Sequence, residues 1–303
     1  MKIIPDSINL DAYMRAADDI RVTVRPASDF RSKLHAVFAP RDPSAKRPEM
    51  FSTKLRHVIE FRPGEVTVWA GYNGHRKSIF AGQVALDLLV QRQNVLVASF
   101  EMEPADTLGR MARQALAQAS PSPQALDEFL AWTGDRLSVF DHLGTITPER
   151  ALAVCRYFAE ELKGQHVFID SMMMVCASEE HLDEQKQFMT RLVRFAIETG
   201  LHVHLIAHCR KPQTGEDKPP TKYDLRGSAS ISDQAHNVIT VWANKAKKGR
   251  ADQDVTDPDA FITVEKQRNG RFEGRAKMWF DEMTFRFCDD GVAPVVPYAA
   301  LAE

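Results

Sequence analysis

The stretch VTVWAGYNGHRKS, residues 66–78, decides the fold class of this chain. Its first residues, Val66–Trp69, are mostly apolar and predict a short buried strand. A turn that contains Gly71 and Gly74 follows, and residues Ser78–Gln91 then have an apolar helical pattern. A strand, a glycine-containing turn and a helix in this order are typical of a phosphate-binding loop, G-x-x-x-x-G-K-[ST].

The residue types in this loop suit a nucleoside triphosphate. Backbone N–H groups in a tight turn surround phosphates, and the helix that follows directs the positive end of its dipole at the same place. Lys77 would contact the outer phosphates, and Ser78 would supply an oxygen ligand to Mg²⁺. The turn residues expected around the phosphates are Gly71, Asn73, Gly74, His75 and Arg76. An ordinary surface turn before a helix is the alternative for this stretch taken alone.

Arg76 stands where the motif has its second glycine. At helical backbone angles an arginine is tolerated there. If the position requires a positive φ, the side chain is a strained replacement for glycine, and nucleotide binding would suffer.

Composition limits the class of protein. The chain has 303 residues, a formal net charge of −2, 44% hydrophobic and 26% charged residues, which is ordinary for a globular protein. Because the charge is balanced, any nucleic-acid surface must be local. No C-x-x-C pair, signal peptide or membrane-length apolar run is present, so we expect a soluble protein of a reducing cytoplasm. The scattered cysteines are Cys155, Cys176, Cys209 and Cys288.

Three segments are expected along the chain: an arm (1–50), a main domain (51–288) and a tail (289–303). Helical patterns at Ile8–Ile20 and Ser28–Phe38, before a linker, are too short for a core of their own. We therefore expect the arm to pack on its own body or on a neighbouring subunit, with a free tail as the alternative.

From Phe51 onwards, strand and helix patterns alternate, which predicts an α/β fold with a mostly parallel central sheet flanked by helices. The expected parallel strands are Val66–Trp69, Val95–Phe100, Leu137–Phe140, Val167–Ile169, Val203–Ala207 and Val238–Trp242. The expected helices are Ser78–Gln91, Pro104–Gln118, Pro123–Thr133, Pro148–Leu162 and Asp183–Thr199. Shorter strands at Phe261–Glu265, Ala276–Phe280 and Thr284–Phe287 predict an antiparallel extension at one edge.

Two acidic residues follow predicted strands at the edge where ligands bind in open parallel sheets. Glu101 directly follows the expected strand Val95–Phe100, and its carboxylate could orient or deprotonate a water. Asp170 ends a buried strand and could hold Mg²⁺ opposite Ser78. Each pattern is short, and a solvated acid at a strand end is the alternative.

Histidines cluster around the strand at 203–207. His202 and His204 alternate on one face, where packed core residues are commoner than metal ligands. His208 follows the strand and is placed to approach a γ-phosphate. The loop that follows is basic and could contact a phosphate backbone, although a solvated charged loop is the alternative. Its candidate residues are Arg210, Lys211, Lys222, Gly227 and Ser228.

Lys266 and Arg268 lie two residues apart at the end of a late strand and therefore point the same way. Such a pair is an ordinary protection of an exposed edge. It is also the arrangement with which a neighbouring subunit could insert a cationic finger into an ATP site.

With these elements in order, the chain resembles the RecA-like ATPase domain of replicative hexameric helicases, the DnaB-like, phage and Twinkle group. The resemblance runs from about Phe51 to Phe287. Its markers are PGE at 63–65, the loop at 71–78, SFEM at 99–102, VFID at 167–170, AHCRKP at 207–212, LRGSASI at 225–231 and KQRNG at 266–270. The chain departs from the pattern of this family at two places. Arg76 replaces a glycine that is usual in the family, and His236-Asn237 stands where the family often has an acid.

The resemblance implies a role for each marker. Lys77 and Ser78 would bind ATP and Mg²⁺, with Asp170 as the metal-binding acid. Glu101 would be the base for water, and His208 would sense the γ-phosphate. Lys266 and Arg268 would be supplied in trans by the adjacent subunit. The DNA contacts would come from Arg210, Lys211, Lys222 and Arg226, with Gly227 and Ser228 adding backbone contacts.

The function that the resemblance implies is an ATP-dependent replicative DNA helicase or translocase. It would act as a homo-oligomer, a hexameric ring on single-stranded DNA, with a primase or a loader as a further partner. No primase or collar domain is recognised in these residues, which suggests an ATPase core of a phage or mobile element in a bacterial cytosol. A nucleotide-dependent DNA-binding, loader or recombination-mediator protein and a small-molecule P-loop kinase are the alternatives.

Overall fold

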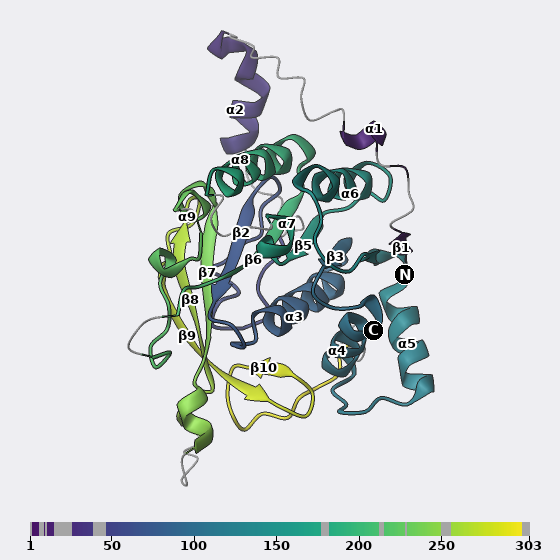
Figure 1. Cartoon of the computed structure of the whole chain (residues 1–303), viewed down its shortest axis with the longest axis vertical. Helices are drawn as coiled ribbons and strands as arrows, with labels where there is room; N and C mark the ends of the chain where they lie inside the picture. Colours follow the sequence, from purple (N-terminus) through teal and green to yellow (C-terminus); the bar gives the residue numbers. More distant parts are fainter. Residues whose placement is uncertain are drawn as a thin grey trace.

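The computed structural model describes residues 2–5, 9, 11–14, 26–38, 47–176, 182–211, 215–227, 229–249 and 256–298. These residues form one ten-stranded sheet in the order β1-β4-β3-β5-β6-β2-β7-β8-β9-β10 (Figure 1). Neighbouring strands are parallel from β1 to β7 and antiparallel from β7 to β10. The predicted fold, a parallel sheet with an antiparallel extension, is therefore confirmed.

The strand bounds follow the predictions closely. The parallel strands are β1 (Lys2–Pro5), β2 (Val66–Gly71), β3 (Val95–Ser99), β4 (Leu137–Asp141), β5 (His166–Asp170), β6 (His202–His208) and β7 (Asn237–Ala243). The antiparallel strands are β8 (Ala260–Gln267), β9 (Gly274–Asp281) and β10 (Arg286–Cys288).

Helices cover both faces of the sheet. On one face lie α3 (Lys77–Val90), α4 (Pro104–Leu116) and α5 (Pro123–Thr133), and on the other lie α6 (Pro148–Glu160), α7 (Met172–Val175) and α8 (Leu182–Thr199). Val68 belongs to the core under α6 and α8, whereas the next residue, Trp69, belongs to the core under α3 and α4. Both faces of β2 are thus buried, which explains why its sequence is a continuous apolar run.

Helix starts follow from local sequence. Proline occupies the first turn of α4, α5 and α6, where its missing N–H costs no hydrogen bond. The side chains of Ser122 and Thr147 accept hydrogen bonds from backbone N–H groups in the first turns of α5 and α6, both at 3.3 Å. Short segments that were not predicted as structured are α9 (Ser230–Gln234) and the 3₁₀ turns η4 (Lys222–Asp224) and η5 (Lys245–Gly249).

The arm packs partly on its own body. Strand β1, which was not predicted, pairs with β4 in parallel at the sheet edge. In α1 (Asp11–Met14), the Tyr13 ring packs edge-on against Tyr157 of α6 at 5.5 Å, and its hydroxyl donates to Glu161 at 3.0 Å. The remainder of the predicted helix Ile8–Ile20, apart from Asn9, lies outside the described residues. The predicted Ser28–Phe38 helix is present as a 3₁₀ turn, η2 (Ala27–Phe30), and α2 (Arg31–Phe38), which projects beyond α8 (Figure 1).

The histidines of β5 and β6 are packed core residues. Trp69 Nε1 donates to His204 Nδ1 at 3.2 Å, and the His202 ring bonds the Thr67 hydroxyl at 2.8 Å. Burial lowers the pKa of His202 to about 4 and holds the pKa values of His166 and His204 well below the usual range. These rings are therefore neutral at pH 7 and act as polar parts of the core. None of the helices in the described ranges has both the length and the apolar character needed to cross a membrane.

Candidate active site

The loop between β2 and α3 has the geometry of a phosphate-binding turn. A side chain on Gly71 would lie 2.4 Å from the carbonyl oxygen of Val241, so only glycine allows this close packing against β7. Gly74 has a φ of +71°, in the left-handed region. The N-terminus of α3 then begins at Lys77, so the turn and the helix dipole meet at one point.

Lys77 is held at the mouth of this turn. Its side chain is 5% exposed, and Nζ donates to the carbonyl oxygen of Tyr72 at 2.9 Å. Burial lowers the pKa of Lys77, and the nearby carboxylate of Asp170 opposes that shift. A buried lysine whose nitrogen bonds only a neutral carbonyl is well suited to exchange that partner for a phosphate oxygen.

The backbone of Arg76 has a positive φ of +64°, in the left-handed region, rather than helical angles. Such a conformation costs a non-glycine residue about 1–2 kcal/mol. The side chain gains contacts in return. Its guanidinium lies 3.9 Å from the centroid of the Phe280 ring and 3.2 Å from Glu282 Oε1. Arg76 therefore fastens the phosphate loop to the end of β9 and the turn that follows it.

Replacing Arg76 with glycine separates these two effects. The backbone angles suit glycine, so we expect Arg76→Gly to bind Mg²⁺-nucleotide at least as well as the wild type. Loss of the contacts with Phe280 and Glu282 should lower the free energy of unfolding by about 1 kcal/mol. Nucleotide titration and thermal unfolding measure the two quantities.

Arg92→Gly is a matched control, because Arg92 also has a positive φ (+63°), in the turn after α3. Its stability should change by less than about 1 kcal/mol, since strain relief and added chain entropy oppose each other. Equal stabilities of the two variants would show that the Arg76 side chain contributes nothing to the fold.

The two acidic candidates lie side by side. Ser99 of β3 pairs with Asp170 of β5, so Glu101 and Asp170 leave neighbouring strands at the same edge. The Ser171 hydroxyl donates to Glu101 Oε1 at 2.6 Å. The Ser78 hydroxyl lies close enough to Asp170 to favour the charged form of its carboxyl, against the effect of burial on its pKa. Burial and the charge of Glu101 raise the pKa of Asp170 to about 6. The Ser78 hydroxyl and the Asp170 carboxylate are oxygen ligands of the kind that Mg²⁺ prefers, so this pair fits the ion.

His208 is the third group at this edge, since it pairs with Gly71 across β6 and β2. Its buried Nδ1 has no hydrogen-bond partner among the residues that the structure describes. Burial, with help from the charge of Lys77, lowers the pKa of His208 to about 4. His208 is therefore neutral at pH 7, with one ring nitrogen able to bond a ligand.

A cleft of about 800 Å³ joins these groups to the basic loop. It brings together Glu101, His208, Arg210, Lys211, Arg226 and Gly227. Lys222 lies elsewhere, with its Nζ donating to the carbonyl oxygen of Glu265 on β8 at 3.3 Å. Ser228 lies outside the described residues. The structure thus groups four of the six predicted DNA contacts around one cleft.

Lys266 and Arg268 are at the opposite end of the sheet from the phosphate loop. Strand β8 runs antiparallel to β7, and Arg268 N donates to the carbonyl oxygen of His236, which precedes β7. His236 N in turn donates to Val66, the first residue of β2. Five residues of strand, about 17 Å, separate Val66 from Gly71. Lys266 and Arg268 of one chain therefore cannot reach the phosphate loop of the same chain.

The sequence interpretation missed several residues beside the loop. Lys245 Nζ donates to the carbonyl oxygen of Asn73 at 3.4 Å and pairs with Glu216 at 3.1 Å. Glu216 also bonds His75 Nε2 at 2.9 Å, while His75 Nδ1 accepts from Ala243 N. The His75 hydrogen bond lowers the pKa of Glu216 to about 2. The run of lysines after β7 was a signal that could have identified Lys245.

A second, larger cleft opens on this side of the loop, with a volume of about 1100 Å³. Its lining includes Gly74, Arg76, Lys245, Lys247, Trp279 and Phe280. Cationic and aromatic side chains beside a phosphate-binding turn suit a nucleoside. This cleft is therefore the candidate site for the nucleoside of a nucleotide whose phosphates lie in the loop.

Comparisons with known proteins agree with this fold. The ATPase domain of G40P aligns with a TM-score of 0.75 at 15% identity, covering 88% of this chain and 99% of that one. A DnaB-like replicative helicase, whose interactions with primase were also described, aligns with a TM-score of 0.70 at 16% identity, covering 88% and 67%. At these identities the likeness shows the fold.

The DNA helicase/primase of Enterobacteria phage T3 is 26% identical over 204 residues, 61% of this chain. The chain spans only about 36% of the length of that relative. The family model of the DnaB-like helicase C terminal domain matches residues 53–289. Because this match covers most of the sequence, including residues 71–78 and 266–268, the chain belongs to the DnaB-like helicase C-terminal domain family of P-loop ATPases.

Proposed function

We propose that this chain is the motor of a replicative DNA helicase, hydrolysing ATP between identical subunits and moving along single-stranded DNA. The observation that carries the proposal is the separation of Lys77 from Arg268 at opposite ends of one sheet. Each chain then offers a phosphate loop at one end and a cationic pair at the other. A head-to-tail ring joins the two ends at every interface, and we propose a hexamer.

Within one interface, each residue of the loop side has a separate task. Lys77 and the backbone of 71–78 would hold the phosphates, and Ser78 and Asp170 would hold Mg²⁺. The ion supplies charge neutralisation at the β- and γ-phosphates when it is bound. Glu101, already oriented by Ser171, would accept a proton from the attacking water.

The cleft beside His208 is the route by which we propose that nucleotide state reaches DNA. His208 lies near enough to Lys77 to feel its charge, and it lines the same cleft as Arg210 and Arg226. A change of hydrogen-bond partner at its Nδ1 would therefore alter the position of a residue that lines that cleft. Tyr223 is 83% exposed in the same loop and offers an aromatic surface on which a base could stack.

The projecting helix α2 supports assembly into an oligomer. Phe30, Leu34 and Phe38 are spaced by four residues and are 43%, 57% and 80% exposed. Residues at this spacing share one helix face. An apolar stripe on a helix that stands away from the body marks an interaction surface. We propose that it packs on a neighbouring subunit, as expected for part of the arm.

Charging this stripe should weaken the assembly. Burying one such side chain contributes about 1.5–3 kcal/mol, so Leu34→Asp and Phe38→Asp should each weaken an interface about 10- to 100-fold. Mass photometry at increasing protein concentration measures the shift toward smaller species. Leu143→Asp, at another exposed leucine (56%), should assemble as the wild type does. Unchanged assembly of the α2 variants would remove this helix from the interface.

Similar proteins support the proposed partner. One DnaB-like replicative helicase was described together with its interactions with primase, and the phage T3 relative is a helicase/primase, so we propose a primase as the partner. A loader is a second proposed partner, and the cytoplasm of a bacterium or of an infected host is the proposed location.

ATP hydrolysis with and without single-stranded DNA tests the proposal. We expect hydrolysis that DNA stimulates severalfold, together with unwinding of a forked duplex. Nucleotide binding without turnover would instead favour a DNA-binding or loader protein. Turnover that depends on a small-molecule acceptor and ignores DNA would favour a kinase.

A further inference from the structure

We infer that Glu65, acting through Asn269, positions Arg268 for its action on the neighbouring subunit. The inference rests on the proposed function, because it assigns the support of the finger rather than the finger itself. No interpretation of the sequence gave Glu65 or Asn269 a role of this kind.

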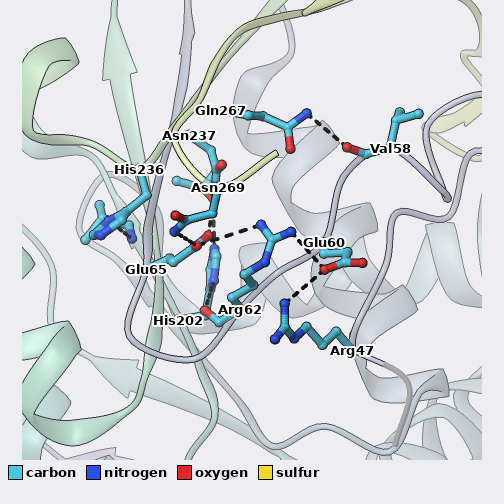
Figure 2. Close-up of polar contacts among 12 residues, drawn as sticks. Arg47, Val58, Glu60, Arg62, Glu65, His202, His236, Asn237, Gln267 and Asn269 are labelled. Carbon is cyan, nitrogen blue, oxygen red and sulfur yellow. Dashed lines mark hydrogen bonds and ion pairs between the residues drawn. The ribbon is translucent and has the colours of Figure 1, made fainter. Parts of the chain in front are cut away.

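Side chains at the end of β8 alternate between two tasks. Lys266 Nζ donates to the carbonyl oxygens of Ser232 and Asp233 at 2.8 Å, and Arg268 donates to Asp233 at 3.0 Å. Both cations thus lie against the C-terminus of α9. Gln267 and Asn269 point the opposite way, toward the segment that leads into β2 (Figure 2).

Glu65 is the fixed point on that side. It is 3% exposed, and its Oε1 accepts a hydrogen bond of 2.6 Å from Asn269 Nδ2. Its Oε2 accepts from Asn237 Nδ2 at 3.1 Å, and Arg62 NH1 lies 3.8 Å from Oε1 (Figure 2). A buried carboxylate is costly unless its oxygens are bonded, so each of these partners is held firmly. Asn269 is itself exposed, and this bond is what ties it to the body.

A second amide holds the turn from the other end. Gln267 is 9% exposed, and its Nε2 donates to the carbonyl oxygens of Val58 at 2.9 Å and Phe272 at 2.8 Å. A side chain on Gly270 would lie 2.2 Å from Gln267 Oε1, so a larger residue there would displace this amide. The backbone of Arg268 is therefore clamped between two anchored amides.

This arrangement leaves the Arg268 side chain as the movable part. Its guanidinium bonds backbone carbonyls of α9, and it is exposed. A finger that leaves these carbonyls to reach another subunit needs a base that does not move, since a displacement of about 1 Å is enough to cost much of a catalytic contact. Glu65 and Asn269 provide that base without contacting nucleotide or DNA.

Subunit mixing tests the inference. Glu65→Gln keeps the shape of the side chain but removes its charge. Asn269→Ala removes the hydrogen bond to Glu65 at an exposed position, where the substitution should have little effect on folding. Each should lower the kcat of DNA-stimulated hydrolysis about tenfold with little change in KM for ATP. Glu60→Gln is the matched control, since Glu60 pairs with Arg47 and Arg62 on the side of the network away from the finger, and it should retain kcat within about twofold.

A positioning role makes a specific prediction for mixtures. Each finger-side variant should regain activity when mixed with Lys77→Ala, whose finger is intact. It should regain none when mixed with Arg268→Ala, whose defect is on the same side. Wild-type kcat in both variants, or rescue by Arg268→Ala but not by Lys77→Ala, would overturn the inference. If Arg268→Ala and Lys77→Ala fail to rescue each other, the proposed function itself fails.

Discussion

Lys77→Ala is expected to abolish ATP hydrolysis, with a loss of at least about 100-fold in kcat, or about 2.7 kcal/mol of transition-state stabilisation. The reason is the position of its Nζ, which is buried at the mouth of the loop and lies near both Asp170 and Glu101. Alanine leaves that pocket without the only cation that the loop itself buries among the described residues. The fold should survive, because the Lys77 side chain bonds a single carbonyl.

Steady-state hydrolysis and nucleotide titration in Mg²⁺ measure this effect. Lys163→Ala is a suitable control, because Lys163 is an exposed lysine in the turn before β5, at the other end of the sheet. It should hydrolyse ATP at the wild-type rate. Normal turnover by Lys77→Ala would remove the phosphate-loop assignment, whatever the resemblance to known helicases.

The order of strands and helices was predictable because both faces of the parallel strands are buried. Each of these strands is then a short apolar run, and the runs are separated by helical patterns. Strand β1 escaped prediction because Lys2–Pro5 is a four-residue edge strand ending in proline, and its pairing with β4 is a tertiary event. Helix α9 escaped for a similar reason, since five residues carry too little periodicity.

The candidate site shows the same division between local and tertiary information. Glu101, Asp170 and His208 were placed together because the ends of parallel strands share one edge. The contacts that compensate the positive φ of Arg76 could not be predicted, since Phe280 and Glu282 lie about two hundred residues away in the sequence. Their contacts let the chain place an arginine where the motif has glycine.

Arg268→Ala is expected to lower hydrolysis about 10³-fold, because a cationic finger that stabilises the transferring phosphoryl group contributes at least that much. Within one chain this loss would be unexplained, since about 17 Å of strand separates the level of Arg268 from the phosphate loop. The loss therefore tests where the finger acts as well as whether it acts. ATP affinity should change little, because the loop side of the site is intact.

Mixing Arg268→Ala with Lys77→Ala separates the two explanations. An interface is complete when an Arg268→Ala subunit, with its loop intact, receives the finger of a Lys77→Ala neighbour. In a random equal mixture this happens at half times half, or about a quarter, of the interfaces of a head-to-tail ring. Hydrolysis should thus rise from near zero to as much as a quarter of the wild-type rate, and less if neighbouring sites must fire in turn. No rescue at any ratio would argue for a site complete within one chain and against the proposed function. Such a site would need a large rearrangement, because Lys77 and Arg268 lie at opposite ends of the sheet.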